Sequence, residues 1–454
     1  MMNTLRQTSM AMFMAAALPA TADRVDFEAL PQAESVSLTL DAGISGLVRW
    51  ADGTTETVTF DGTLKTIQLK SSAFSIETAE SIRYVVCPDN PLTSIDLTNA
   101  PYVRGLYARN CRLTDLKPGV ATALNVLHVS GNPALGEKLA SLSLPALSFL
   151  GAAECELSQL PGADAVPALE GLWAWGNKLT SAPVVGRTNC EQALLQDNRL
   201  STLAVSPALR TLCVSGNKLR RLDLKACNRL ETLDAAHNVV RILYTSPASA
   251  STLRYLYVND NALDYADMPT LSDADGNCYL TDMALDTQAE LKIASTLQPD
   301  AEVSLATFVA ANQWGKQLEA EVTWTDKDGN ALVPGKDYVD KGGYVYTFLK
   351  GFDGVKATAT CADYPGMTLV TGEMHVNAPT AIAGVNDDNA ALNITVDGCR
   401  LSVSADSPAL VTVNDAAGRV LRSGVLRGTW TAHLPAGVYM VNSRKVVVGN
   451  GLSN

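Results

Sequence analysis

The stretch 169-LEGLWAWGNKL-179 sets a pattern with apolar residues at positions one, four, six and eleven and Asn at position nine. The pattern returns as 209-LRTLCVSGNKL-219, 230-LETLDAAHNVV-240 and 253-LRYLYVNDNAL-263. Weaker copies occupy residues 82–92, 103–113, 124–134, 147–157 and 190–200, and successive copies start 19–23 residues apart. Self-similarity at a fixed short period is the signature of a repeat architecture, so this stretch decides the fold.

The columns of the repeat have a direct physical meaning. Positions four and six alternate with neighbours expected to be exposed, which predicts one short strand in each copy. An Asn side chain carries both an acceptor and donors, so position nine can satisfy buried loop amides of adjacent turns. One copy cannot bury its own apolar edge, whereas stacked copies share a continuous core. The predicted structural column is Asn90, Cys111, Asn132, Cys155, Asn177, Asn198, Asn217, Asn238 and Asn261.

This repeat resembles that of leucine-rich-repeat proteins, which tolerate Cys in the Asn column. About ten residues separate the copies, and they are too few and too rich in turn residues for a full helix. We therefore expect short extended or 3₁₀ segments on the convex side. The predicted fold is mainly β. A leucine-rich-repeat solenoid with the shape of a flat horseshoe is expected over residues 81–300, which include its C-terminal cap. Small β-sandwich modules are expected on either side of it.

The N-terminal flank predicts two different segments. Residues 1–22 carry Arg6, an apolar run and a small-x-small site before Asp23, which is typical of a cleavable signal peptide. Residues 23–80 contain strand-like runs and a 52-DG-53 hairpin turn, and they resemble the β caps that precede leucine-rich repeats in bacterial surface proteins. Such a cap would cover the open end of the solenoid core.

The C-terminal flank predicts further β modules. Residues 301–377 alternate strands with polar turns and resemble a small immunoglobulin-like module, and residues 378–391 are turn-prone and indicate a linker. Residues 392–454 resemble the C-terminal sorting domain of the type IX secretion system, through 411-VTVNDAAGRV-420, 434-LPAGVY-439 and 445-KVVV-448. That resemblance implies export across the outer membrane with the secretion machinery as a partner; another small β-sandwich is the alternative.

Composition narrows the function. The 454 residues carry a formal net charge of −12, and no basic stripe stands out in the sequence, which argues against nucleic acid or anionic lipid as a partner. No apolar stretch is long enough to predict a transmembrane helix. Common catalytic motifs are absent, so we expect no enzyme, cofactor or metal. Residues 273–277, DADGN, could suggest calcium, but the rest of a calcium loop is missing and a solvated turn is favoured.

Binding on the repeats is the better hypothesis. Positions five and seven of each copy should point onto the concave face, where Trp173 and Trp175 would lie side by side among small residues. Exposed tryptophans are unusual and serve as anchors for protein partners or as platforms for sugar rings. The candidate binding residues are Tyr107, Arg109, His128, Trp173, Trp175, Gln196, Tyr257 and Asn259.

These observations predict an exported or cell-surface protein-interaction or adhesin module whose partner is a protein or glycan on a host or bacterial surface. A glycan-binding protein and a structural envelope component are the alternatives. The nine cysteines fall largely in repeat columns, with Cys87 and Cys190 in apolar positions. We therefore expect mostly free, buried thiols despite export.

Overall fold

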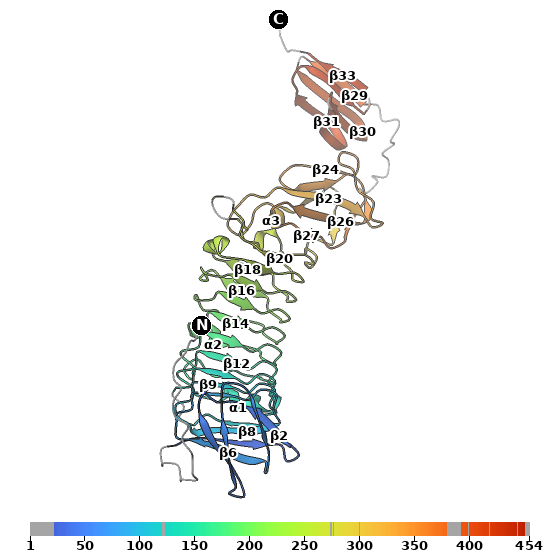
Figure 1. Ribbon diagram of the computed structural model, residues 1–454. Helices are drawn as coiled ribbons and strands as arrows, with labels where there is room; N and C mark the ends of the chain where they lie inside the picture. Colours follow the sequence, from blue (N-terminus) through green and yellow to red (C-terminus); the bar gives the residue numbers. More distant parts are fainter. Residues whose placement is uncertain are drawn as a thin grey trace. The chain divides into compact units, whose positions relative to one another are not determined.

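A computed structural model describes residues 22–119, 123–272, 275, 277–298, 300–378, 392–397, 399–416, 418–442 and 444–449 (Figure 1). The expected signal peptide therefore falls outside the described residues up to residue 21, as does the expected linker from residue 379. The chain divides into two compact units. The first comprises residues up to 290 together with 308–320 and 360–369, and the second comprises 291–307, 321–359 and the residues from 370 onward.

A ten-stranded parallel sheet runs through the repeats of the first unit, one short strand per copy (Figure 1). Neighbouring strands pair in constant register, so that Leu150, Leu172 and Ala193 stand opposite one another on successive strands. These position-four side chains are buried, as the repeat pattern predicts. The chain is therefore a mainly-β leucine-rich-repeat solenoid. Its strands are β7 (Tyr84–Val86), β9 (Gly105–Tyr107), β11 (Val126–His128), β12 (Phe149–Gly151), β13 (Gly171–Trp173), β14 (Gln192–Leu194), β15 (Thr211–Cys213), β17 (Thr232–Asp234), β19 (Tyr255–Tyr257) and β20 (Asp282–Ala284).

The last strand, β20, belongs to a copy that the sequence pattern did not reveal. Gln288 takes the place of the ninth-position Asn: its Nε2 donates to Val258 O and Leu285 O, both at 2.9 Å. Its Oε1 accepts from Leu263 N at 3.0 Å. The longer side chain reproduces the contacts of the Asn column, so the solenoid has ten turns.

The Asn column joins each turn to the one before it. Asn177 Oδ1 accepts from Cys155 N and Leu157 N, at 3.0 and 2.9 Å, and its Nδ2 donates to Ala152 O and Ala174 O. An unsatisfied buried amide costs about 1–3 kcal/mol, so each such side chain removes several potential penalties. The column therefore holds the turns in register.

Two cysteines replace Asn in this column without losing the donor. Cys111 Sγ donates to Cys87 O at 2.8 Å, and Cys155 Sγ donates to Val129 O at 3.3 Å. Each of the nine cysteines lies in the described part of the chain and is a free thiol, and six of them are buried. Burial raises the pKa of Cys155 to about 11, which keeps its thiol protonated and unreactive.

The residue before the Asn column has a left-handed backbone in every copy. Where it is not glycine, φ lies between 52° and 58°. Beside Gly131 a Cβ would lie 1.9 Å from Asn110 Oδ1, so a larger residue there would have to displace the Asn110 side chain. This position turns the chain out of the strand at the same point of each rung. The ten residues are Asp89, Asn110, Gly131, Glu154, Gly176, Asp197, Gly216, His237, Asp260 and Thr287.

The convex side carries short elements, as expected from the brief return segments. Two of them, β16 (Arg221–Leu224) and β18 (Ile242–Thr245), form a two-stranded parallel sheet. The others are η1 (Pro133–Leu135), α1 (Gly136–Ala140), α2 (Pro183–Arg187) and η2 (Pro247–Ser251). Each of the two α-helices has five residues, little more than one turn. Proline and the short segments between copies leave no room for longer helices.

A β cap begins the first unit. Its six-stranded sheet has the order β10 (Asp115–Lys117), β8 (Leu92–Asn99), β1 (Asp23–Ala29), β6 (Ala73–Thr78), β3 (Ser45–Trp50) and β4 (Thr55–Thr59). A second pair, β2 (Ser35–Leu38) and β5 (Lys65–Gln68), is antiparallel. Strands β8 and β10 come from the return segments of the first two copies. The cap and the solenoid therefore share a sheet beyond residue 80.

The last turn of the first unit is closed by aromatic packing. Tyr265, in η3 (Tyr265–Asp267), stacks on Tyr364 with ring centroids 5.5 Å apart, and both rings are buried. Tyr265 Oη donates to Met367 O at 2.9 Å, and Asn312 Nδ2 donates to Tyr364 Oη at 3.0 Å. These contacts cover the end of the repeat core, which would otherwise be exposed to solvent.

The strands of residues 296–376 form two sheets around buried Trp324. One has the order β21 (Thr296–Leu297), β28 (Met374–Val376), β26 (Phe352–Cys361) and β23 (Ala320–Asp326), with β27 (Thr368–Val370) beside β26. The other has the order β22 (Glu302–Ser304), β25 (Val345–Phe348) and β24 (Tyr338–Asp340), and α3 (Ala306–Val309) follows β22.

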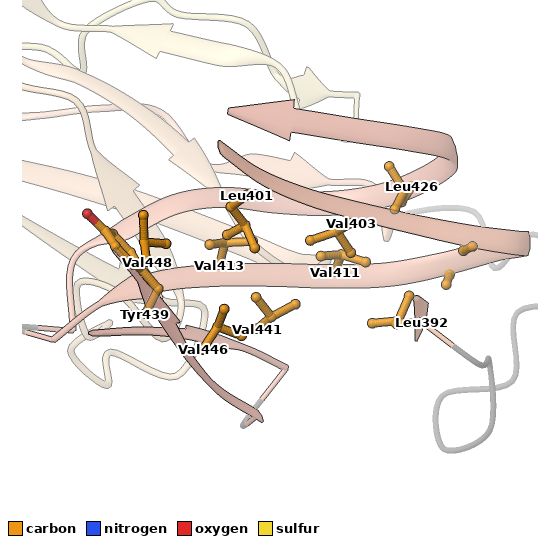
Figure 2. Close-up of a cluster of buried hydrophobic side chains, with 12 residues drawn as sticks. Leu392, Leu401, Val403, Val411, Val413, Leu426, Tyr439, Val441, Val446 and Val448 are labelled. Carbon is orange, nitrogen blue, oxygen red and sulfur yellow. The ribbon is translucent and has the colours of Figure 1, made fainter. Parts of the chain in front are cut away.

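The final module is an antiparallel five-stranded sheet with its own apolar core. Its strands are β29 (Leu392–Asp397), β30 (Arg400–Asp415), β31 (Val420–His433), β32 (Gly437–Val441) and β33 (Arg444–Val448). Figure 2 shows Val411, Val413, Val441, Val446 and Val448 converging in one cluster. No helix within the described residues is long and apolar enough to cross a membrane.

Candidate binding face

The concave face is built from three positions of each copy. Positions four and six of the copy at β13, Leu172 and Ala174, are fully buried. Positions three, five and seven, Gly171, Trp173 and Trp175, lie on the opposite side of the strand. Positions five and seven were predicted from the sequence to face outward; position three adds a third row of side chains to this surface.

Four aromatic side chains form a connected cluster on this face. The His128 ring lies 6.5 Å from that of Tyr107, 6.1 Å from that of Phe149 and 5.9 Å from that of Trp173, all edge to face. Phe149 and Trp173 meet edge to face with ring centroids 5.0 Å apart. Such pairs contribute about 0.5–1.5 kcal/mol beyond their buried area. The four residues, which we call the aromatic cluster, are Tyr107, His128, Phe149 and Trp173.

Glycines on the neighbouring strands make room for these rings. A Cβ at Gly151 would lie 2.6 Å from His128 Cδ2, and a Cβ at Gly171 would lie 2.9 Å from Phe149 Cδ2. Each ring therefore lies over the bare backbone of the next strand. A side chain at Gly151 or Gly171 would collide with the ring above it. The rings can lie where they do only because these two positions are glycine.

The two tryptophans differ in their support. Trp173 is half-buried in the aromatic cluster, and its Nε1 donates to Gln192 Oε1 at 2.7 Å. Trp175 keeps 37% of its surface exposed. In the next copy, Gln196 occupies the same column, and the buried Oε1 of Gln196 has no hydrogen-bond partner among the described residues. Trp175 thus offers an exposed apolar surface on the same face as the aromatic cluster.

The charge of this region is set by few groups. Burial, and then the nearby Arg109 guanidinium, lower the pKa of His128, so its imidazole is neutral at pH 7. Arg109 is exposed and lies 3.8 Å from Asp89 in an ion pair. The aromatic cluster is therefore uncharged, and the Arg109 cation lies two residues from Tyr107 at one end of it.

Beyond the cluster the face becomes polar and acidic. Tyr257 Oη donates to Asp282 Oδ2 at 2.9 Å, and this bond is the main cause that raises the pKa of Tyr257. Ser215 Oγ donates to Asp234 Oδ2 at 2.6 Å. Asn259 Nδ2 bonds its neighbour Asp260, so its amide is engaged within the loop.

The predicted site residues therefore separate into two groups. Tyr107, His128 and Trp173 share the aromatic cluster, and Trp175 and Gln196 lie beside it; Tyr257 and Asn259 lie in the acidic part of the same ladder. The surface near the tryptophans is aromatic rather than composed of small residues. Phe149 was missed because it occupies position three, which the alternation of the strand could have placed on the outer face.

The described residues contain no cluster of side chains suited to bind a metal ion. No group of three or more His, Cys, Asp or Glu side chains able to hold a metal ion occurs in the part of the chain that the structure describes. The DADGN turn weighed for calcium has residues 273, 274 and 276 outside that part.

No protein-family model matches the sequence, and no curated protein matches it. Among solved structures, it is similar to InlP of Listeria monocytogenes, at 17% identity and a TM-score of 0.37, over 63% of this chain and 77% of that one. It is also similar to the InlJ domain of L. monocytogenes described as including a cysteine ladder, at 14% identity and a TM-score of 0.34, over 68% and 94%. YopM from Yersinia enterocolitica matches at 23% identity and a TM-score of 0.31, over 47% of this chain and only 43% of its own length.

Proposed function

We propose that this chain is a protein-interaction module that binds a partner through the concave face of its repeats, with Trp175 as the anchor. The observation that carries the proposal is an exposed tryptophan, Trp175, on the same face as an uncharged aromatic cluster and two residues from its member Trp173. Large aromatics that protrude from a fixed, apolar support are the residues that dominate binding energy at protein interfaces.

Geometry supports this proposal in two further ways. The cluster is positioned by glycines and edge-to-face contacts, so little side-chain freedom is lost when a partner covers it. The half-buried Gln196 amide, in the same column as Trp175 one copy further on, adds a polar group next to the apolar anchor. An interface core that combines aromatic area with few specific polar contacts is the usual pattern.

Export to the cell surface, as an adhesin, is the second part of the proposal. Its support is the sequence of residues 1–22, which resembles a signal peptide, and of residues 392–454, which resembles a type IX sorting domain. Described residues of the latter fold around their own core, as a separable sorting module requires. Fractionation of cells that express the chain with and without residues 392–454 tests it. Equal surface display of both forms would contradict this part.

Photo-cross-linking identifies the partner and tests the face. A photoreactive amino acid at Trp175 should capture the partner, whereas the same group at Tyr102, an exposed aromatic in the return segment between the first two copies, should not. With the partner in hand, Trp175→Ala should raise Kd at least about 30-fold, equivalent to about 2 kcal/mol. The matched control Tyr102→Ala should leave Kd unchanged.

A stability control separates binding from folding. Trp175 is exposed, so its replacement should leave the unfolding midpoint almost unchanged, whereas Trp173→Ala removes ring contacts and should lower it. An unchanged Kd in both tryptophan variants would overturn the proposal. Quenching of tryptophan fluorescence by neutral sugars, with no protein captured, would favour a glycan ligand instead.

A further inference from the structure

The repeats bring together cations that are far apart in the sequence. Arg199 and Lys218 occupy position ten of consecutive copies, and Arg220 and Arg241 occupy the position two residues further on. All four side chains are exposed. They line the flank where the chain leaves the Asn column, which is separate from the concave face, and we call them the basic stripe.

Backbone hydrogen bonds fix the neighbours along this stripe. Arg241 N donates to Arg220 O at 3.0 Å, which places those two residues on adjacent rungs. Lys218 N donates to Leu200 O at 2.9 Å, so Lys218 follows Arg199 in the same way. Adjacent strands of a sheet lie about 4.8 Å apart, so like charges are held on neighbouring rungs.

These cations lack internal counter-charges. Among the described residues, no ion pair involves any side chain of the basic stripe, whereas Lys178, one copy earlier in the same column, pairs with Glu156. Like charges on neighbouring strands oppose folding, and an external anion would remove that repulsion. The stripe is the more distinctive because the whole chain carries a net charge of −12.

The surroundings favour carbohydrate over nucleic acid. Single-stranded nucleic acid needs open aromatic faces for base stacking. The aromatic ring of the adjoining segment is Tyr244, and Lys225 Nζ lies 3.9 Å and Arg221 Cζ 5.1 Å from its centroid. Since two cations already occupy that ring, the flank offers charges on successive rungs without an open ring for base stacking.

We infer that the basic stripe binds a linear acidic polysaccharide, whose carboxylate or sulfate groups would contact Arg199, Lys218, Arg220 and Arg241 in succession. This site is independent of the concave face, so a ligand there and a protein partner on the aromatic cluster can be held at once. Successive rungs repeat these positions in the direction in which the copies stack, and a chain-like polyanion can follow that direction.

Fluorescently labelled heparin oligosaccharide is the probe, with the full chain at about 50 and about 200 mM salt. Four ionic contacts, each releasing about 0.7–0.9 counterion, should weaken binding about 50- to 150-fold over that range. Replacement of all four stripe residues by Gln should weaken binding at low salt at least about 10-fold and flatten the salt dependence. Lys218→Gln alone should reduce the logarithmic salt slope by about 0.7–0.9.

The control removes the same charge elsewhere. A variant with Arg104→Gln, Lys292→Gln, Lys336→Gln and Arg427→Gln changes four exposed cations that lie off the stripe. It should bind heparin within about twofold of the unaltered chain. Equal loss in both variants, or no loss in the stripe variant, would overturn the inference. Tighter binding of a single-stranded oligonucleotide than of heparin, through the same four residues, would also overturn the assignment to polysaccharide.

Discussion

Replacing Asn177 by Ala tests the role of the Asn column directly. Its Oδ1 is the acceptor for two buried amides, Cys155 N and Leu157 N, and its Nδ2 serves two buried carbonyls, Ala152 O and Ala174 O. Asn177 is buried, so these groups are largely shielded from water. At about 1–3 kcal/mol for each unsatisfied buried group, and with partial relaxation, Asn177→Ala should lower the free energy of unfolding by about 3–6 kcal/mol.

Asn198 provides a matched comparison one turn further on. Its Nδ2 likewise donates to two buried carbonyls, Ala174 O and Leu195 O, but its Oδ1 accepts from one amide, Leu179 N. Asn198→Ala therefore leaves one amide fewer without a partner. We expect it to cost about 1–3 kcal/mol less than Asn177→Ala.

Urea denaturation followed by circular dichroism gives the two free energies, and hydrogen exchange gives the local effect. In Asn177→Ala, the amides of Cys155 and Leu157 should lose protection before the rest of the ladder, because each copy depends on its neighbours. Equal losses of unfolding free energy in the two variants would contradict the claim that each buried amide left without a partner adds to the loss. A loss below about 1 kcal/mol for Asn177→Ala would contradict it as well.

Three further predictions concern packing, pH and thiols. Gly151→Ala should displace the His128 ring and cost about 1–3 kcal/mol of unfolding free energy, measured by urea denaturation; an unchanged stability would contradict the packing argument. Burial raises the pKa of Asp264 to about 7 and that of Asp267 to about 6. The folded state therefore holds protons that the unfolded chain releases near pH 4. This contribution to stability is fully present below about pH 4 and is lost as pH rises through 6 and 7. In a variant with both residues changed to Asn, the unfolding midpoint should vary less with pH between pH 5 and 8. An unchanged dependence of the midpoint on pH would refute the assignment to these two carboxyl groups. Thiol titration of the denatured, unreduced protein should find most of the nine cysteines free, and buried Cys155 should resist the reagent until the protein unfolds; few reactive thiols after denaturation would refute it.

Sequence pattern was sufficient for the solenoid because its period is imposed by shared burial. Every copy must present apolar side chains at the same positions, so the register could be read without structure. The tenth copy escaped because Gln288 replaces Asn and comes later than the 19–23-residue period allows. Strand β1 was also missed, although Val25, Phe27 and Ala29 alternate with polar residues, since it directly follows the expected cleavage site.

The candidate sites were less predictable because they depend on contacts between copies. The alternation of a strand places Trp173 on the outer face, but only the structure shows that Phe149 and His128 support it. The glycines at 151 and 171 carry no chemical signal in sequence, yet they make room for the rings. Charges such as Arg199 and Lys218 form no run along the chain and become a surface only when the turns stack.

A residue with a left-handed backbone precedes the Asn column in every copy, so the chain has the same conformation at that point of each turn. These points are equivalent positions at which one copy could be joined to another. Joining Asp197 directly to Asn217 would remove one whole turn while connecting two residues that already occupy successive columns. Recombination between such joints would lengthen or shorten the binding face by complete rungs, leaving the cap and the closing turn untouched. A lineage carrying this chain could thus change the reach of its surface by copy number alone, without altering any single rung.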